Sequence, residues 1–238
     1  MKAVAVAAPV TMKLSKRTLD ILKNFSVINP SLYVENGNKL YTISNSMTVI
    51  AEAKIEETFG SKFSIYELTR FLGVVSLFNS PEFEFEDNCV NIFGQTGSKV
   101  KYHFCQNTLL DKLVKNYGRT PKDNMDMYSF DITSKQIDEL TRAASVLSLN
   151  NLKRCKSEQG GVDVSVFDRE KATDNAYTIN IQNGTVSDDD AEPCFMKINL
   201  LNLLPGDYTV EFGQGPSTRW TNKTANILYY IVKEANKE

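Results

Sequence analysis

The chain presents the same order of secondary-structure elements twice, on either side of a polar connector. Each half begins with an amphipathic helix, continues with a hairpin and a further strand, and then has a second helix and short closing strands. Gly118 and Pro121 mark the connector as irregular. This repetition predicts two similar α+β domains, each with two helices on largely antiparallel sheets.

The expected domains cover residues 12–107 and 128–238, with an interdomain connector at 108–127. Residues 1–11 are expected to be an N-terminal extension or to follow a mis-assigned start, because Met12 is a second candidate initiator. The chain has 238 residues, of which 42% are hydrophobic and 24% charged. That composition allows each domain to bury a core of its own.

The first helix is predicted over residues 15–25, with Ser15 as its N-cap. One side of this helix is polar and carries Lys16, Arg17, Asp20, Lys23 and Asn24. The other side carries Thr18, Leu19, Ile21, Leu22 and Phe25. A helix of this kind either lies solvated on a core or offers its cations to a polyanion, and the segment alone does not separate these two interpretations.

Other local signals give further expectations for the first half. A tight hairpin is expected at Asn36–Gly37, and a second helix over residues 64–79 with a capping box of Ser64 and Glu67. Three short strands are expected within residues 82–105.

The second half carries equivalent signals. Its first helix is expected to begin with a capping box of Thr133 and Gln136. A hairpin should turn at Gly160–Gly161, and a short helix from Ile198 should stop at Pro205–Gly206. A closing strand is expected within residues 226–234.

Residues that would indicate catalysis are scarce. His103 is the single histidine, which disfavours a histidine-based triad or a multi-histidine metal site. The stretch 94–99 lacks the spacing of a phosphate-binding loop, and the acidic run 188–190 is typical of an exposed loop. The four cysteines are widely spaced, so free thiols in a reducing compartment are expected. These observations favour a binding or scaffold protein over an enzyme.

Five stretches resemble one known family in their order along the chain. They are MKLSKRTLDILKNFSVINPSLYVENGNKLYTIS (12–44), FSIYELTRFLGVVSLFN (63–79), SLNNLKRCKSEQGGVDVSVFDREKATDNAYTINI (148–181), INLLNLLPGDY (198–208) and ILYYIVKE (227–234). This order resembles the sliding clamps of T4-type bacteriophages, which are DNA polymerase processivity factors. Residues 1–11 have no counterpart, and the helix before Pro205 is shorter than in the family.

The resemblance implies a non-catalytic ring. Three subunits of two domains each would close head-to-tail as a homotrimer with sheets outside, and helices would line a hole that encircles duplex DNA without sequence specificity. The implied partners are a DNA polymerase and an ATP-driven clamp loader, in the cytoplasm of the infected host cell. No cofactor, metal or membrane contact is implied.

The resemblance also implies that cations on the inner face attract DNA phosphate. Such attraction is independent of sequence and permits sliding, and a net charge of −2 keeps the exterior from competing for DNA. The expected DNA-facing residues are Lys13, Lys16, Arg17, Lys23, Arg70, Lys135, Arg142 and Lys197. Asp138 and Glu139 share the helix face of Lys135 and Arg142 and are candidates to pair with them.

Partners of such clamps dock short peptides, often from a chain end, in an apolar pocket beside the connector. The resemblance and the adaptability of methionine together suggest the residues of that pocket. The expected client-peptide residues are Met47, Met125, Tyr128, Tyr230 and Val232.

Two other functions fit the same sequence. A polymerase accessory protein could bind DNA on a basic face without encircling it, and its mass in solution would distinguish it from a ring. A structural scaffold protein would not need these lysines at all.

Overall fold

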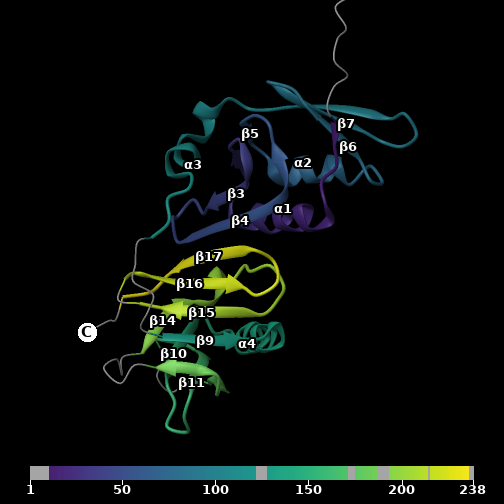
Figure 1. Ribbon diagram of the computed structural model, residues 1–238. Coiled ribbons are helices and arrows are strands. Elements are labelled where there is room, and N and C mark those ends of the chain that lie inside the picture. Colours follow the sequence, from purple (N-terminus) through teal and green to yellow (C-terminus); the bar gives the residue numbers. More distant parts are fainter. Residues whose placement is uncertain (1–10, 122–127, 171–174, 187–192, 214, 236–238) are drawn as a thin grey trace, which may run out of the picture. The chain divides into compact units, whose positions relative to one another are not determined.

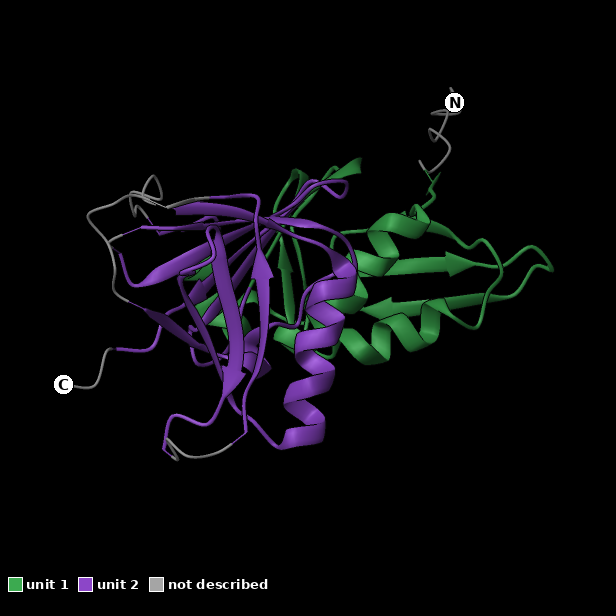
Figure 2. Ribbon diagram, turned by 90° about the horizontal axis from the view of Figure 1, so that it is seen from below, with its two compact units in different colours: residues 1–42, 54–117 green, residues 43–53, 118–238 purple. Residues whose placement is uncertain are grey.

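The structure of the chain is a computed structural model with two compact units (Figure 2). It describes residues 11–121, 128–170, 175–186, 193–213 and 215–235. Unit 1 comprises Met1–Thr42 and Lys54–Tyr117, and unit 2 comprises Ile43–Ala53 and Gly118–Glu238. Both units combine helices with antiparallel strands, which confirms the predicted α+β class. The predicted boundaries at 107 and 128 remain a prediction.

Unit 1 contains most elements of the first half (Figure 1). Its strands are β1 (Thr11–Met12), β2 (Leu32–Val34), β3 (Gly37–Ile43), β5 (Phe63–Ile65), β6 (Glu82–Phe85), β7 (Cys89–Phe93) and β8 (Lys99–His103). Its helices are α1 (Lys16–Ile28), α2 (Leu68–Val75), the 3-10 turn η1 (Asn107–Leu110) and α3 (Asp111–Asn116). Strands β1, β6, β7 and β8 form one sheet in that order, and helices α1 and α2 pack against each other.

Unit 2 contains the long helix α4 (Ser134–Leu147), which packs on β11 and β12. The strands of the second half are β9 (Tyr128–Ile132), β10 (Asn151–Lys156), β11 (Val162–Phe167), β12 (Tyr177–Ile181), β13 (Gly184–Val186), β14 (Cys194–Lys197), β15 (Tyr208–Phe212), β16 (Ser217–Asn222) and β17 (Ile227–Val232). One sheet has the order β12-β11-β10-β14. A second has the order β13-β9-β15-β16-β17-β4-β3, in which β4 is Val49–Phe59.

Strand β4 (Val49–Phe59) joins the second sheet through its first residues. Ala51 pairs with Tyr229, and Ala53 pairs with Ile227. This pairing explains why the stretch 43–53 clusters with unit 2, although it precedes most of unit 1 in the sequence.

The predicted helix starts at both capped helices are confirmed. The Ser15 hydroxyl accepts a hydrogen bond from the Thr18 amide at 3.2 Å. The Gln136 amide donates to the Thr133 hydroxyl at 3.3 Å, and the Thr133 amide donates to the Gln136 side chain at 2.9 Å. Both caps satisfy amides of the first turn that have no partner within the helix.

The hairpin predicted at Asn36–Gly37 is wrong. A tight hairpin turn of this type needs positive φ at both central residues, and here only Gly37 has it, at 121°. Strand β2 pairs instead with β5, so that Tyr33 lies opposite Ser64. All three β2 residues are buried, without the alternation of a half-exposed hairpin strand.

The second helix of unit 1 begins later than predicted. Helix α2 starts at Leu68 after Glu67, which makes no side-chain cap, so the Ser64–Glu67 capping box is wrong. Ser64 belongs to β5, and its hydroxyl donates to the Asn107 side-chain oxygen at 2.7 Å. The pairing of β5 with β2 therefore overrides the local helix signal.

The short helix predicted before Pro205 is reduced to the 3-10 turn η2 (Ile198–Leu200). The backbone of Leu204 bonds to two buried tyrosines instead of to a preceding helical turn. Its amide donates to the Tyr229 hydroxyl at 3.0 Å, and its carbonyl accepts from the Tyr208 hydroxyl at 2.5 Å. A segment this short gains too few helical hydrogen bonds to offset nucleation.

Candidate nucleic-acid interface and peptide site

Helix α1 presents lysines to solvent because its opposite side is anchored in the core. Ile21 and Phe25 are fully buried, while the Lys16 and Lys23 side chains are 90% and 66% exposed. The start of the helix is tied to β4 through Glu57, whose carboxylate accepts from the Ser15 amide and from the Thr18 hydroxyl. Burial opposes ionisation of Glu57, yet these hydrogen bonds hold its pKa below the usual value.

Lys16 and Lys23 share one carboxylate. The Lys16 ammonium lies 2.5 Å from Oδ2 of Asp20, and the Lys23 ammonium lies 3.6 Å from Oδ1. The spacing of four and then three residues brings all three side chains to one face of α1. The helical arc places Asp20 on this face, but its role between the two lysines was not predicted from the sequence.

Arg17 is less available than the two lysines. Its Nη2 atom donates to the Lys54 carbonyl at 3.5 Å, and its Nε atom is buried without a hydrogen-bond partner. The guanidinium therefore lies along strand β4. Among the cations expected on α1, Lys16 and Lys23 are the ones that the helix projects into solvent.

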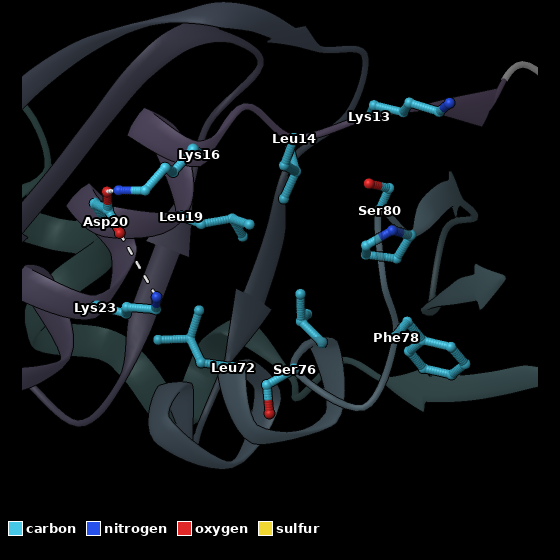
Figure 3. A pocket seen from close by; sticks show the side chains of 12 residues that line it. Lys13, Leu14, Lys16, Leu19, Asp20, Lys23, Leu72, Ser76, Phe78 and Ser80 are labelled. Atoms are coloured by element: carbon cyan, nitrogen blue, oxygen red, sulfur yellow. Dashed lines mark hydrogen bonds and ion pairs between the residues drawn. The ribbon is translucent and has the colours of Figure 1, made fainter. Parts of the chain in front are cut away.

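A groove of about 360 Å³ lies between α1 and α2 (Figure 3). Lys13, Lys16 and Lys23 line it together with apolar residues that include Leu19 and Leu72. Among the predicted residues, the structure thus brings these three lysines to one groove of unit 1.

The two other predicted DNA-facing cations of unit 1 have carboxylate partners. Lys13 lies 3.3 Å from Glu82, and Arg70 lies 3.2 Å from Glu67. The Lys13 and Arg70 side chains are more than half exposed.

Two of the predicted cations of unit 2 lie on α4. The Lys135 side chain is 86% exposed and lies 3.8 Å from Glu139, so the suspected pairing is present. Arg142 is exposed and makes no ion pair with any described residue. Both side chains are therefore open to solvent.

Lys197 differs from these because it lies on strand β14. Its ammonium lies 3.1 Å from Glu234, whose carboxylate also accepts from Asn151 at 2.6 Å. Arg169 lies 3.8 Å from the same carboxylate. No described contact joins Lys197 to the cations of α4, so its expected DNA-facing role stays a prediction without support from a neighbour.

Three of the predicted peptide-site residues lie close together. The Val232 amide donates to the Thr48 carbonyl at 2.9 Å, next to Met47. Met47 sits in a turn with φ 59° and is 54% exposed. Tyr230 and Val232 alternate with the buried Tyr229 and Ile231, so they share the solvent face of β17.

Of the other two predicted peptide-site residues, the structure describes Tyr128, which does not join this cluster. Tyr128 is buried on the core face, where its ring lies 4.1 Å from the Arg154 guanidinium. Met125 lies outside the described residues.

One neighbour of this cluster was not predicted from the sequence. Arg219 pairs with Tyr230 across β16 and β17 and forms a two-pronged ion pair with Glu211. The hydrogen bonds to Glu211 raise the pKa of Arg219. The alternation of strand 208–212 is the signal that would place Glu211 on the solvent face, and Arg219 lies opposite it on β16.

Other kinds of site find no support in the part of the chain that the structure describes. No group of three histidine, cysteine or acidic side chains within these residues could hold a metal ion. No described helix is long and apolar enough to cross a membrane.

Comparison with known proteins gives consistent sequence matches. A family model described as DNA polymerase processivity factor matches residues 13–88. The sliding clamp of Vibrio phage KVP40 is 25% identical and covers 94% of this chain and 100% of its own length. The sliding clamp of Enterobacteria phage T4 is 26% identical and covers 94% of this chain and 98% of its own length.

Solved structures share the fold at lower sequence identity. A PCNA of A. fulgidus, solved with the C-terminal region of FEN-1 bound, superposes with a TM-score of 0.71 at 11% identity. It covers 96% of this chain and 99% of its own. A PCNA of Entamoeba histolytica gives a TM-score of 0.69 at 8% identity, over 94% of this chain and 98% of its own. These similarities show the DNA clamp fold.

Proposed function

We propose that this chain, which is a sliding clamp of the T4-phage type, closes as a ring of three copies around duplex DNA and tethers the replicative DNA polymerase. It would act without catalytic activity of its own, in the cytoplasm of the infected host cell, after loading by an ATP-driven clamp loader. The observation that carries the proposal is the exposed lysine pair of α1 beside the groove of unit 1, within a chain similar to known clamps along 94% of its length.

Ring closure is supported by two unlike sheet edges. Strands β8 and β12 each end a sheet of the described strands. Both carry half-buried apolar side chains at this edge: Val100 and Tyr102 on β8, and Tyr177 and Ile179 on β12. An exposed edge of this kind is a template for pairing with another chain. Joining two different edges head-to-tail generates a ring when the rotation closes.

The opposite edges of these two sheets are less suited to pairing between copies. Strand β1 has only two residues. Strand β14 is partly covered, because the Glu234 amide donates to the Phe195 carbonyl at 2.8 Å. We therefore propose that β8 of one copy pairs with β12 of the next.

Polymerase attachment is proposed at the cluster of Met47, Tyr230 and Val232. The exposed Met47 and the half-buried Tyr230 and Val232 lie at the turn before β4 and offer a hydrophobic anchor point for a peptide. The A. fulgidus PCNA is solved with a chain-terminal segment of another protein bound, which supports the same mode here. Met125 remains a predicted member of the site, whereas Tyr128 is buried on the core face and is not proposed as a peptide contact.

The DNA-facing role of α1 can be tested by removing its two exposed lysines. Lys16→Ala with Lys23→Ala should weaken binding to duplex DNA, because the variant neutralises fewer phosphates and releases fewer counterions. The plot of log affinity against log salt should become shallower by about 0.9 for each phosphate that the helix no longer neutralises. Fluorescence anisotropy of a labelled duplex over a salt series measures this slope.

A matched control removes the same charge elsewhere in unit 1. Lys112 and Lys115 are exposed on α3, outside the predicted DNA-facing set. Lys112→Ala with Lys115→Ala should leave the slope unchanged. If both double variants behave alike at every salt concentration, α1 does not face DNA.

A further inference from the structure

The cations proposed to face DNA are already compensated within the chain. Six of the eight lie within 4.0 Å of a carboxylate oxygen. These six are Lys13, Lys16, Lys23, Arg70, Lys135 and Lys197. A phosphate that approaches such a cation must therefore compete with a carboxylate of the same subunit. The carboxylates of this surface therefore oppose the attraction between its cations and DNA phosphate.

Among these carboxylates, Asp20 pairs with two of the predicted DNA-facing cations at once. It bridges two lysines through separate oxygens, with 2.5 Å to Lys16 and 3.6 Å to Lys23 (Figure 3). Its side chain is 33% exposed, whereas those of its partners are 90% and 66% exposed. The carboxylate thus lies nearer the helix than the ammonium groups, which leaves both ammonium groups open to solvent.

Asp20 carries its negative charge at neutral pH. The hydrogen bond from Lys16 is the main cause that lowers the pKa of Asp20, and Lys23 adds to it. Exposed pairs of this kind are each worth little free energy, typically about 1 kcal/mol or less. DNA phosphate can therefore displace Asp20 at small cost, and Asp20 can return when the phosphate leaves.

We propose that Asp20 is a displaceable intramolecular counterion that limits how tightly α1 holds the duplex. The inference rests on the proposed function, since it presumes that Lys16 and Lys23 meet DNA. By recapturing the lysines, Asp20 takes the place of salt ions that would otherwise be released, and it weakens each phosphate contact. A clamp that must slide needs contacts of this kind, which exchange without a large barrier.

The test is the isosteric variant Asp20→Asn in the full-length chain. The slope of log affinity against log salt should become steeper by about 0.9 for each α1 in contact with DNA. When salt falls from about 200 to 50 mM, the affinity of both proteins for DNA should rise. For each α1 in contact with DNA, the rise should be about three- to fourfold larger for the variant than for the wild type. Anisotropy of a labelled duplex is the measurement. Asp20→Glu should have the same slope as the wild type, because it keeps the carboxylate.

Asp111→Asn is the matched control. Asp111 also pairs with a lysine four residues away, Lys115 at 2.7 Å, on a helix outside the predicted DNA-facing set. The slope of log affinity against log salt for Asp111→Asn should equal that of the wild type. A thermal melt of each variant shows whether it is still folded. If Asp20 had a merely structural role, its replacement would leave the slope of log affinity against log salt unchanged.

The outcomes separate this inference from the proposed function. If Lys16→Ala with Lys23→Ala makes the slope shallower but Asp20→Asn leaves it unchanged, the counterion role is overturned and the DNA-facing role stands. If neither changes the slope, both are overturned. If Asp20→Asn steepens the slope equally when both lysines are absent, the effect does not pass through them, which also overturns the inference.

Discussion

Replacing Ile179 with Asp should convert a particle of about three times 26.8 kDa into single copies of the chain. Ile179 is half-buried on β12, the strand at the edge of its sheet. In the proposed ring this edge is covered by β8 of the next copy. The introduced carboxylate would then lose its water without gaining a partner, which costs several kcal/mol.

The neighbouring residue provides a control on the same strand. Thr178 is exposed on the opposite face of β12, and Lys99 and Lys101 are exposed on β8. Thr178→Asp should therefore leave the trimer intact. Sedimentation or light scattering gives the mass, and circular dichroism shows whether each variant folds. Ring closure through β12 would be contradicted by a folded Ile179→Asp variant that keeps the trimer mass.

Replacing Tyr230 and Val232 together with Ala should weaken binding of the polymerase's terminal peptide by roughly 30-fold, which corresponds to about 2 kcal/mol. Both side chains lie on the solvent face of β17, and the double variant lacks the apolar anchor surface beside Met47. The core should remain intact, because Tyr229 and Ile231 point to the other face and are fully buried. Titration calorimetry with the peptide measures the affinity.

A tyrosine elsewhere tests whether the effect is local. Tyr66 is 57% exposed in unit 1, and Tyr66→Ala makes the tyrosine part of the same change away from the proposed site. Its peptide affinity should match that of the wild type. The trimer mass should persist in both variants. Undiminished affinity in the Tyr230 and Val232 double variant would exclude this cluster as the anchor site.

Helices α1 and α4 could be predicted because their signals are local. Each has a capping side chain at its start, and each has one apolar side that the core buries. In α4, Ile137, Leu140 and Ala144 recur at intervals of three and four residues and are buried. Caps and periodicity depend on residues within a few positions of one another, so one sequence suffices to find them.

The wrong predictions concern pairings between distant segments. Ser64 and Glu67 have the spacing of a capping box, but the strand Phe63–Ile65 finds its partner in Leu32–Val34. The pair Asn36–Gly37 has the composition of a tight turn, but the same long-range pairing removes β2 from the hairpin. Long-range strand pairing depends on the whole fold and leaves no local sign in these few residues.

Part of the candidate site could also be predicted from local sequence signals, and part could not. The exposed lysines of α1 follow from the helical arc, because Lys16 and Lys23 lie opposite Ile21 and Phe25. The inward turn of Arg17 does not follow, since it depends on the Lys54 carbonyl of a distant strand. The burial of Tyr128 does not follow either, since its ring lies against Arg154 on a strand of the other sheet.

The most direct test of the central claim is the length of DNA that the polymerase synthesises before it dissociates. The assay uses primed circular DNA, the phage polymerase and the clamp loader with ATP, with and without this chain. We predict products many times longer when the chain is present, and Ile179→Asp should abolish that gain. Products of equal length with and without the wild-type chain, under conditions in which the loader hydrolyses ATP, would contradict its role as a sliding clamp.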